Sequence, residues 1–188
     1  LKPSRFGRPL REDSPVDYDN LKRGPYVWAK AAAERLAAER ARDGRLDLRT
    51  MRLGPLVDFD AYTPPCRLGR EVARLFVAMG QPWSRLAICG VGTAATALQH
   101  YAQHFEATPP VVNLVESPAL ARRDLVVRLR RARPDLKVLW MPFPVLRVLS
   151  LMLTALQKLL RPSKPALNLY SAFKSEPYDD SVVRQMNL

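Results

Sequence analysis

The chain has 188 residues, and 30 Lys and Arg residues against 18 Asp and Glu residues give it a formal net charge of +12. A hydrophobic share of 47% is typical of a globular protein and argues against a disordered chain. Two cysteines and two histidines exclude a disulfide scaffold and leave little material for a metal centre, so we expect no metal site.

The positive charge comes mostly from arginine, with 23 Arg and 7 Lys spread along the chain. Many of them recur at helical spacing among Ala and Leu, which favours solvated helix faces over a nucleic-acid-binding stripe. The densest cluster, within residues 128–133, has no interleaved aromatic side chains on which bases could stack. We therefore expect no nucleic-acid partner, and a basic, non-catalytic module that binds nucleic acid or acidic membrane stays open as an alternative.

Residues 1–25 are rich in Pro, Asp and Arg and are expected to form a loop. The Ala-rich run 26–42 predicts a helix, because Pro25 is suited to a first helical position and an Asp-Gly pair follows the run. Alternating apolar and polar residues over 46–57 predict a strand that enters a turn at Gly54.

The rest of the chain alternates between expected helices and expected strands. Helices are predicted at 68–79, 94–106, 118–132 and 144–161, and strands at 86–89, 111–115 and 137–141. Such alternation favours an α/β architecture with parallel strand pairing.

The segment 138–160 is apolar enough to raise the question of a membrane. It contains two prolines and Arg147, and the apolar stretch after Arg147 is too short to span a bilayer. A buried or groove-lining helix is the first interpretation. A helix that lies on a membrane surface is the second, favoured by the basic residues Lys158, Arg161 and Lys164 at one end.

A Tyr-x-x-x-Lys pair occupies the first turn of the predicted helix 26–42. The i, i+4 spacing puts Tyr26 and Lys30 on one helix face. Tyrosine is a poor base at neutral pH, and a cation within a few Å favours its phenolate, so this pair suits general acid–base chemistry. A second match, Tyr18 to Lys22, lies in the polar loop, where no stable helix would align the two side chains.

The surroundings of Tyr26 carry a family resemblance. An acidic-Pro loop at 12–15, the Tyr-x-x-x-Lys pair followed by Ala33-Glu34, and the strand-like run 48–55 resemble the extended short-chain dehydrogenase/reductases. This group contains NAD-dependent sugar epimerases and dehydratases and 3β-hydroxysteroid-dehydrogenase-like relatives. The segments 142–160 and 178–181 resemble the C-terminal substrate lobe of the same group.

The resemblance implies NAD or NADP as the cofactor. Tyr26 would be the catalytic acid/base, and Lys30 would bond the cofactor ribose and activate Tyr26. Both residues would thus also contact the cofactor. Leu53 and Leu56 would bracket a segment that passes beside the nicotinamide.

The resemblance also implies a division of the chain. Residues 1–58 would be the C-terminal part of a Rossmann-type NAD(P)-binding domain, with the catalytic helix and the following strand, and residues 59–188 a smaller α/β substrate lobe. The chain opens with Leu rather than Met, and the family's glycine-rich phosphate loop lies far upstream of the tyrosine. We therefore expect a segment of a longer protein, from which the N-terminal half is missing and which is inactive alone.

A second glycine-rich turn competes with this interpretation. A predicted strand runs into Gly90-x-Gly92-x-x-Ala95, a helix follows, and the next strand reaches Glu116. This is nearly the dinucleotide-binding fingerprint, with a helix N-terminus for pyrophosphate and an acid for ribose. It lies after Tyr26, the reverse of the family order, so we assign it to the substrate lobe.

The remaining candidates carry little chemistry. His100 and His104 share a helix face but have no third ligand nearby, and Cys66 and Cys89 have no adjacent base, so inert side chains are expected.

The sequence thus predicts part of an NAD(P)-dependent epimerase/dehydratase or reductase that acts on a nucleotide sugar. A hydroxysteroid or lipid-alcohol dehydrogenase of the same superfamily is the alternative. Expected partners are this small-molecule substrate, the missing N-terminal half, a second copy in a homodimer and a peripheral membrane surface. The expected location is the cytoplasm.

Overall fold

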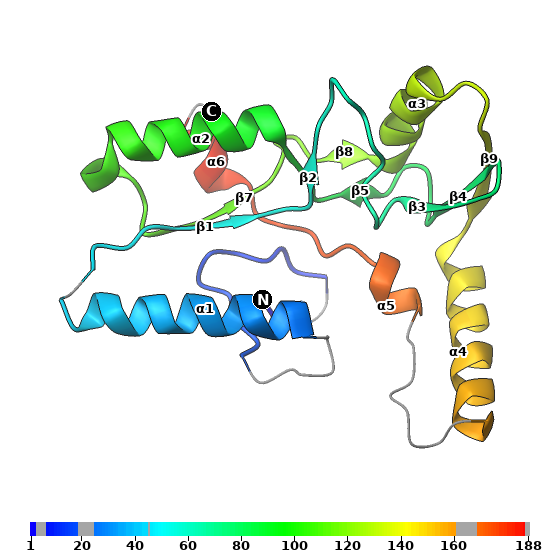
Figure 1. Cartoon of the computed structure of the whole chain (residues 1–188), viewed down its shortest axis with the longest axis horizontal. Coiled ribbons are helices and arrows are strands. Elements are labelled where there is room, and N and C mark those ends of the chain that lie inside the picture. The colour runs from blue at the N-terminus through cyan, green and yellow to red at the C-terminus, as the bar shows by residue number, and fades with distance from the viewer. Residues whose placement is uncertain (3–6, 19–24, 45, 161–168, 187–188) are drawn as a thin grey trace.

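A computed structural model describes residues 1–2, 7–18, 25–44, 46–160 and 169–186. Within these ranges the chain is a mixed α/β protein with several small sheets (Figure 1). Its helices are α1 (Pro25–Arg42), α2 (Val91–Gln103), α3 (Arg122–Ala132), α4 (Phe143–Leu160), α5 (Leu169–Phe173) and α6 (Ser181–Gln185), with a 3₁₀ turn η2 (Phe105–Ala107). Its strands are β1 (Thr50–Leu53), β2 (Leu56–Val57), β3 (Gly69–Val72), β4 (Leu75–Met79), β5 (Arg85–Leu86), β6 (Cys89–Gly90), β7 (Val111–Leu114), β8 (Leu120–Ala121) and β9 (Lys137–Met141).

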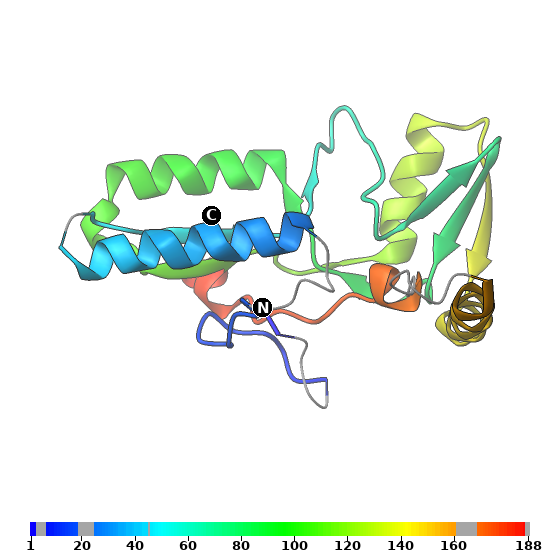
Figure 2. The ribbon, with the colours of Figure 1, turned by 60° about the horizontal axis from the view of Figure 1, so that its bottom comes forward.

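The first half of the fold is a parallel pair of strands between two helices. β1 and β7 pair in register, with Thr50 opposite Val111, and lie between α1 on one side and α2 on the other (Figures 1 and 2). On the α2 side, buried Val112 and Leu114 pack against Ala97. The pairing of β1 with β7 crosses the boundary suggested at residue 58, which stays a prediction.

The helix expected at 26–42 is confirmed as α1, which begins at Pro25 as the sequence predicts. Helix α1 is attached to the β1–β7 pair by an ion pair between Glu34 of α1 and Arg52 of β1. Nη2 of Arg52 lies 2.6 Å from Oε1 of Glu34. The same guanidinium donates to the backbone oxygen of Glu12 at 2.9 Å, so the N-terminal loop is held there too. The Glu12 carboxylate accepts from the backbone N–H of Asn113 in β7 at 3.0 Å.

The second half of the fold is built on a three-stranded sheet in the order β3–β4–β9. β4 pairs with β9 in parallel and with β3 in antiparallel orientation. The main core lies here, where Phe76 and Ala78 of β4 meet Leu125 and Leu129 of α3. Two short pairs, β2–β6 and β5–β8, connect this half to the first.

The prediction of a helix at 68–79 is wrong, because these residues form the hairpin of β3 and β4. The segment contains strong helix formers, which favoured a helix locally. The chain instead turns at Ala73, whose φ of 54° lies in the left-handed region. Pairing with β9 then buries Phe76 and Ala78, and this long-range packing outweighs the local preference.

The other elements lie close to their predicted positions. The strand at 137–141 is confirmed as β9 with the predicted bounds, and the strand at 111–115 and the helices at 94–106, 118–132 and 144–161 are present with shifted ends. The strand predicted at 46–57 is divided into β1 and β2 by Gly54 and Pro55, and the one predicted at 86–89 is divided between β5 and β6.

A buried arginine ties four segments of the second half together. Arg122 is fully buried, and its guanidinium donates to the backbone oxygens of Arg67 at 2.7 Å, Met79 at 2.9 Å and Phe173 at 2.9 Å. The ring of Phe143 at the start of α4 lies 5.2 Å from its guanidinium carbon. Burial lowers the pKa of Arg122 to about 10, which still leaves it charged at neutral pH.

Candidate functional site

Strands β1 and β7 and the first turn of helix α1 meet at one end of the β1–β7 pair. Parallel strands end at the same edge of a sheet, and ligands of open α/β sheets bind at this carboxyl edge. Helix α1 runs in the opposite direction, so its first turn begins at the end where β1 and β7 stop (Figures 1 and 2). The Tyr26–Lys30 turn therefore lies at the edge where a ligand is expected.

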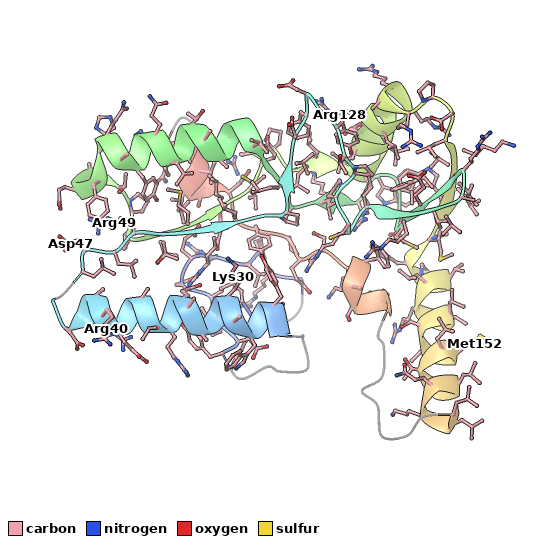
Figure 3. The ribbon with its side chains drawn as sticks, in the orientation of Figure 1. Lys30, Arg40, Asp47, Arg49, Arg128 and Met152 are labelled. Carbon is pink, nitrogen blue, oxygen red and sulfur yellow. The ribbon has the colours of Figure 1, made fainter. Side chains whose placement is uncertain are left out.

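Tyr26 and Lys30 are brought together as the spacing predicts. The Lys30 ammonium lies 5.8 Å from the centre of the Tyr26 ring, and Lys30 is marked on α1 in Figure 3. The Tyr26 side chain is 73% exposed, so its hydroxyl is accessible from outside the described chain. Leu53 at the end of β1 and Leu56 at the start of β2 are also exposed.

A cavity of about 540 Å³ opens beside the segment that follows β7. Its walls come from this segment, from β5 and from the segment that leads into α6. They carry both signs of charge and several hydroxyl groups, and the lining residues are Arg85, Ala87, Val115, Glu116, Ser117, Pro118, Ala119, Ser175, Glu176, Pro177, Tyr178, Asp180 and Arg184. The predicted site residues Tyr26, Lys30, Leu53 and Leu56 are not among them.

The Asp180 carboxylate connects two parts of the cavity wall. It accepts from the hydroxyl of Ser117 at 2.6 Å and pairs with Arg184 one turn along α6. The hydrogen bond from Ser117, followed by the contacts with Arg184, lowers the pKa of Asp180. The carboxylate is therefore ionised at neutral pH and fixes the cavity's C-terminal wall against the segment after β7.

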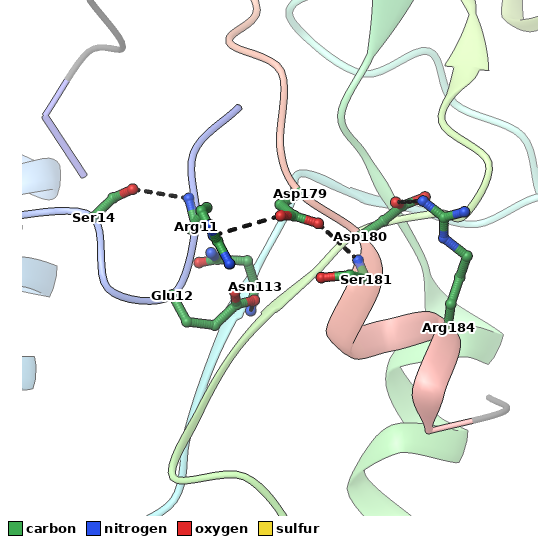
Figure 4. Close-up of polar contacts among 8 residues, drawn as sticks. All are labelled: Arg11, Glu12, Ser14, Asn113, Asp179, Asp180, Ser181 and Arg184. Atoms are coloured by element: carbon green, nitrogen blue, oxygen red, sulfur yellow. Dashed lines mark hydrogen bonds and ion pairs between the residues drawn. The ribbon is translucent and has the colours of Figure 1, made fainter. Parts of the chain in front are cut away.

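The neighbouring Asp179 ties the N-terminal loop to the same wall (Figure 4). Its carboxylate accepts from the backbone N–H of Ser181 at 3.0 Å and lies 3.6 Å from Nε of Arg11. The hydrogen bonds from Ser181 lower the pKa of Asp179. Next to this ion pair, Leu10 and Tyr178 form a parallel β-bridge. The N-terminal loop is therefore attached to the segment that forms the cavity wall.

The competing glycine-rich turn is filled by a side chain of the protein. The Glu116 carboxylate accepts from the backbone N–H of Gly90 at 2.7 Å and from the hydroxyl of Thr93 at 2.8 Å. Its oxygen thus occupies the helix N-terminus at which a dinucleotide-binding turn would hold pyrophosphate. Glu116, the acid that the fingerprint would reserve for ribose, instead accepts hydrogen bonds from this turn, which argues against a dinucleotide there.

The remaining candidates stay apart from the cavity. No group of three or more His, Cys, Asp or Glu side chains that could hold a metal ion occurs among the described residues. The rings of His100 and His104 lie 4.9 Å apart on α2. Cys66 is exposed and Cys89 is buried.

The sequence did not single out the cavity residues Arg85, Ser117 and Arg184 as parts of a site. Residues Tyr178 to Ser181 did carry a signal, through their resemblance to the family's substrate lobe, but their position in a cavity wall could not be derived from the sequence. The buried Arg122 had no signal at all, since it stands in an ordinary Arg-rich helix start.

No family model, no curated protein and no solved structure matches the chain.

Proposed function

We propose that these residues supply the catalytic helix and the substrate lobe of an NAD(P)-dependent enzyme that epimerises, dehydrates or reduces a nucleotide sugar. The observation that carries the proposal is the Tyr26–Lys30 pair on the helix turn that begins at the carboxyl edge of β1 and β7, with the Lys30 ammonium 5.8 Å from the centre of the Tyr26 ring. The finer fold assignment, to the C-terminal part of a Rossmann-type domain, belongs to this proposal. It is supported by the parallel β1–β7 pair between two helices.

The residues present fit one end of a dinucleotide only. Tyr26 is exposed at the sheet edge, and the Lys30 ammonium has donors for a ribose hydroxyl, so the nicotinamide-ribose end has suitable partners. The one turn with the glycine spacing for pyrophosphate holds Glu116 instead. The pyrophosphate would therefore bind to residues other than Gly90 and Gly92.

Each side chain has a definable task in the proposed reaction. Tyr26 would take the proton from a substrate hydroxyl, or return it, at its phenolic oxygen. Lys30 would favour the phenolate by its charge and orient the ribose. A bound nicotinamide would supply the hydride acceptor or donor.

The cavity supports a charged substrate rather than a sterol. Arg85 of β5 and Arg184 of α6 are exposed cations in its wall, and guanidinium groups bind phosphate oxygens in two-point contacts. Within the described residues Arg85 forms no ion pair, whereas Arg184 is paired with Asp180. We therefore assign the diphosphate of the sugar nucleotide to Arg85.

The chain offers its own control for the catalytic test. Tyr26→Phe should reduce turnover of nucleotide sugars with NAD⁺ or NADP⁺ by about a hundredfold or more, because general acid–base catalysis is lost. Tyr18→Phe, the same change in the second Tyr-x-x-x-Lys match, should leave turnover unchanged. Both are measured in the enzyme that carries these 188 residues. Equal rates for Tyr26→Phe and the unmodified enzyme would overturn the assignment.

Substrate binding can be measured separately on the chain itself by calorimetry with UDP-glucose. Arg85→Ser should weaken binding, and Arg130→Ser, on helix α3 and outside the cavity lining, should not. Binding to DNA or to acidic vesicles that falls steeply with salt, without any binding of nucleotide sugar, would favour the non-catalytic basic module instead.

A further inference from the structure

Helix α4 presents the largest run of exposed apolar side chains among the described residues. It is the one described helix that is long and apolar enough to cross a membrane, with a mean hydropathy of 1.5 and only 11% of it buried. Length and composition alone are weak support for a membrane. Which face of α4 is buried and which is exposed says more about the role of the helix.

The uncharged polar side chains of α4 lie on the face that packs on the protein, whereas Arg147 and Lys158 are exposed. Phe143, Leu146, Ser150, Thr154 and Gln157 follow the 3-4-4-3 spacing of one helix face. Leu146 and Ser150 of this face are buried, and the Ser150 hydroxyl accepts from the backbone N–H of Tyr170 at 3.3 Å. None of its three polar residues is without an interaction.

The opposite face is apolar and turned outward. We define the outer stripe of α4 as Val145, Val148, Met152, Leu156 and Leu159, which have the same 3-4-4-3 spacing and are each more than half exposed. Met152, labelled in Figure 3, points away from the rest of the protein. Leu151, Leu153 and Leu160 widen the exposed surface on both sides of the stripe.

On a water-soluble surface the outward face of a helix is polar, because the apolar face packs inward, whereas the outward face of α4 is apolar. An apolar patch of this kind marks a surface that is covered in the working protein. Removing such apolar side chains from water is favourable, so the stripe favours docking onto an apolar environment.

The charges around α4 indicate which kind of partner covers its outer stripe. Between Asp135 and Glu176 the sequence has six basic residues and no acidic one, and Arg147 and Lys158 lie on the same flank of α4, three turns apart. A second copy on this face would bring two such basic segments together and would be repelled. An anionic lipid surface accepts both the apolar stripe and the positive flank.

We propose that the outer stripe of α4 inserts into the interface of a membrane that contains anionic lipids and docks the protein there. The helix lies in the interface and does not span the bilayer, because Leu146 and Ser150 are packed against α5 and the adjoining core. Arg147 and Lys158 then contact lipid phosphates.

Flotation of the chain with vesicles tests this proposal. We use phosphatidylcholine vesicles with about one third phosphatidylglycerol, and vesicles of phosphatidylcholine alone. The unmodified chain should float with the anionic vesicles and bind the neutral ones more weakly. Met152→Glu/Leu156→Glu should reduce binding by about tenfold or more, since two charges enter the interface.

The matched control places the same new charge on an exposed leucine of another helix. Leu98→Glu, on α2, should float like the unmodified chain. Lys158→Gln should weaken binding to anionic vesicles and leave binding to neutral vesicles unchanged. Circular dichroism confirms that each variant is folded, and the single change Leu159→Glu, in the last turn, gives an independent measure of the stripe.

Three results would overturn the proposal. The unmodified chain stays at the bottom of the gradient with both vesicles, or the Glu variants float as well as the unmodified chain does. The third is a dimer in analytical ultracentrifugation that the double Glu variant dissociates, without vesicle binding. The assay contains no nucleotide and no turnover, so its failure is independent of the proposed catalytic function.

Discussion

The carboxylate of Glu116, just beyond the end of β7, accepts a hydrogen bond from the backbone N–H of Gly90, 2.7 Å away, where α2 begins. This contact places a negative charge at the positive end of the helix. It also explains why a glycine stands at position 90, because a Cβ there would lie 2.8 Å from the same carboxylate oxygen and 3.0 Å from the Phe59 ring. The glycine-rich turn is thus fitted to an internal acid.

The two glycines of this turn should therefore respond in opposite ways to alanine. Gly90→Ala should lower the free energy of unfolding by about 1–3 kcal/mol, because the Cβ displaces the Glu116 carboxylate or Phe59. A Cβ on Gly92 meets nothing within 4 Å, and Gly92→Ala should raise stability by about 0.5–1 kcal/mol as a better helix former. Urea unfolding of both variants measures the difference. Equal destabilisation by both changes would contradict the close contact between Gly90 and the Glu116 carboxylate.

Asp180 makes stability depend on pH in the acidic range. Its pKa is lowered in the folded chain, chiefly by the hydrogen bond from Ser117. The carboxylate therefore adds stability above its unfolded pKa of about 4, and this contribution is lost as the pH falls through the lower folded pKa. Asp180→Asn should be less stable than the unmodified chain at neutral pH, and the difference should shrink toward low pH.

Unfolding by urea at a series of pH values measures this difference. Asp60→Asn, a change of an acid that lies outside the cavity wall, serves as the control. A stability difference for Asp180→Asn that is constant with pH would show that the ionised form is not the stabilising one.

Among the arginines that the structure describes, Arg122 should be the most sensitive to substitution. Arg122→Met keeps the apolar stem but removes the donors that satisfy the backbone oxygens of Arg67, Met79 and Phe173. Each hydrogen bond to a charged donor is worth about 1.5–3 kcal/mol, so the loss should reach about 3 kcal/mol or more. The neighbouring Arg123→Met, at an exposed side chain, should change stability by no more than about 0.5 kcal/mol. Thermal unfolding compares the pair.

The two cysteines should differ in reactivity by their burial. Burial, and to a lesser degree the Glu116 charge, raises the pKa of Cys89 to about 11, so the thiolate is scarce at neutral pH. Cys66 is exposed. Titration with a thiol reagent at pH 8 should label one thiol rapidly and the second only on unfolding. Rapid labelling in a Cys66→Ser variant would contradict the burial of Cys89.

Elements with local signals could be predicted from the amino-acid sequence. Helix α1 follows from its alanines and from Pro25, and β7 and β9 follow from short apolar runs between turn residues. The distance between Tyr26 and Lys30 also follows from helical spacing alone, since i and i+4 side chains share a face.

Features that depend on contacts between distant residues could be seen only in the folded chain. The segment 68–79 became a hairpin because β9, almost sixty residues later, pairs with β4 and outweighs local helix preference. The glycine-rich turn resembles a phosphate-binding site in the sequence, but in the folded chain the Glu116 carboxylate is bound to it. The outward apolar face of α4 was likewise hidden, because periodicity shows that a helix has two faces, while packing decides which one is buried.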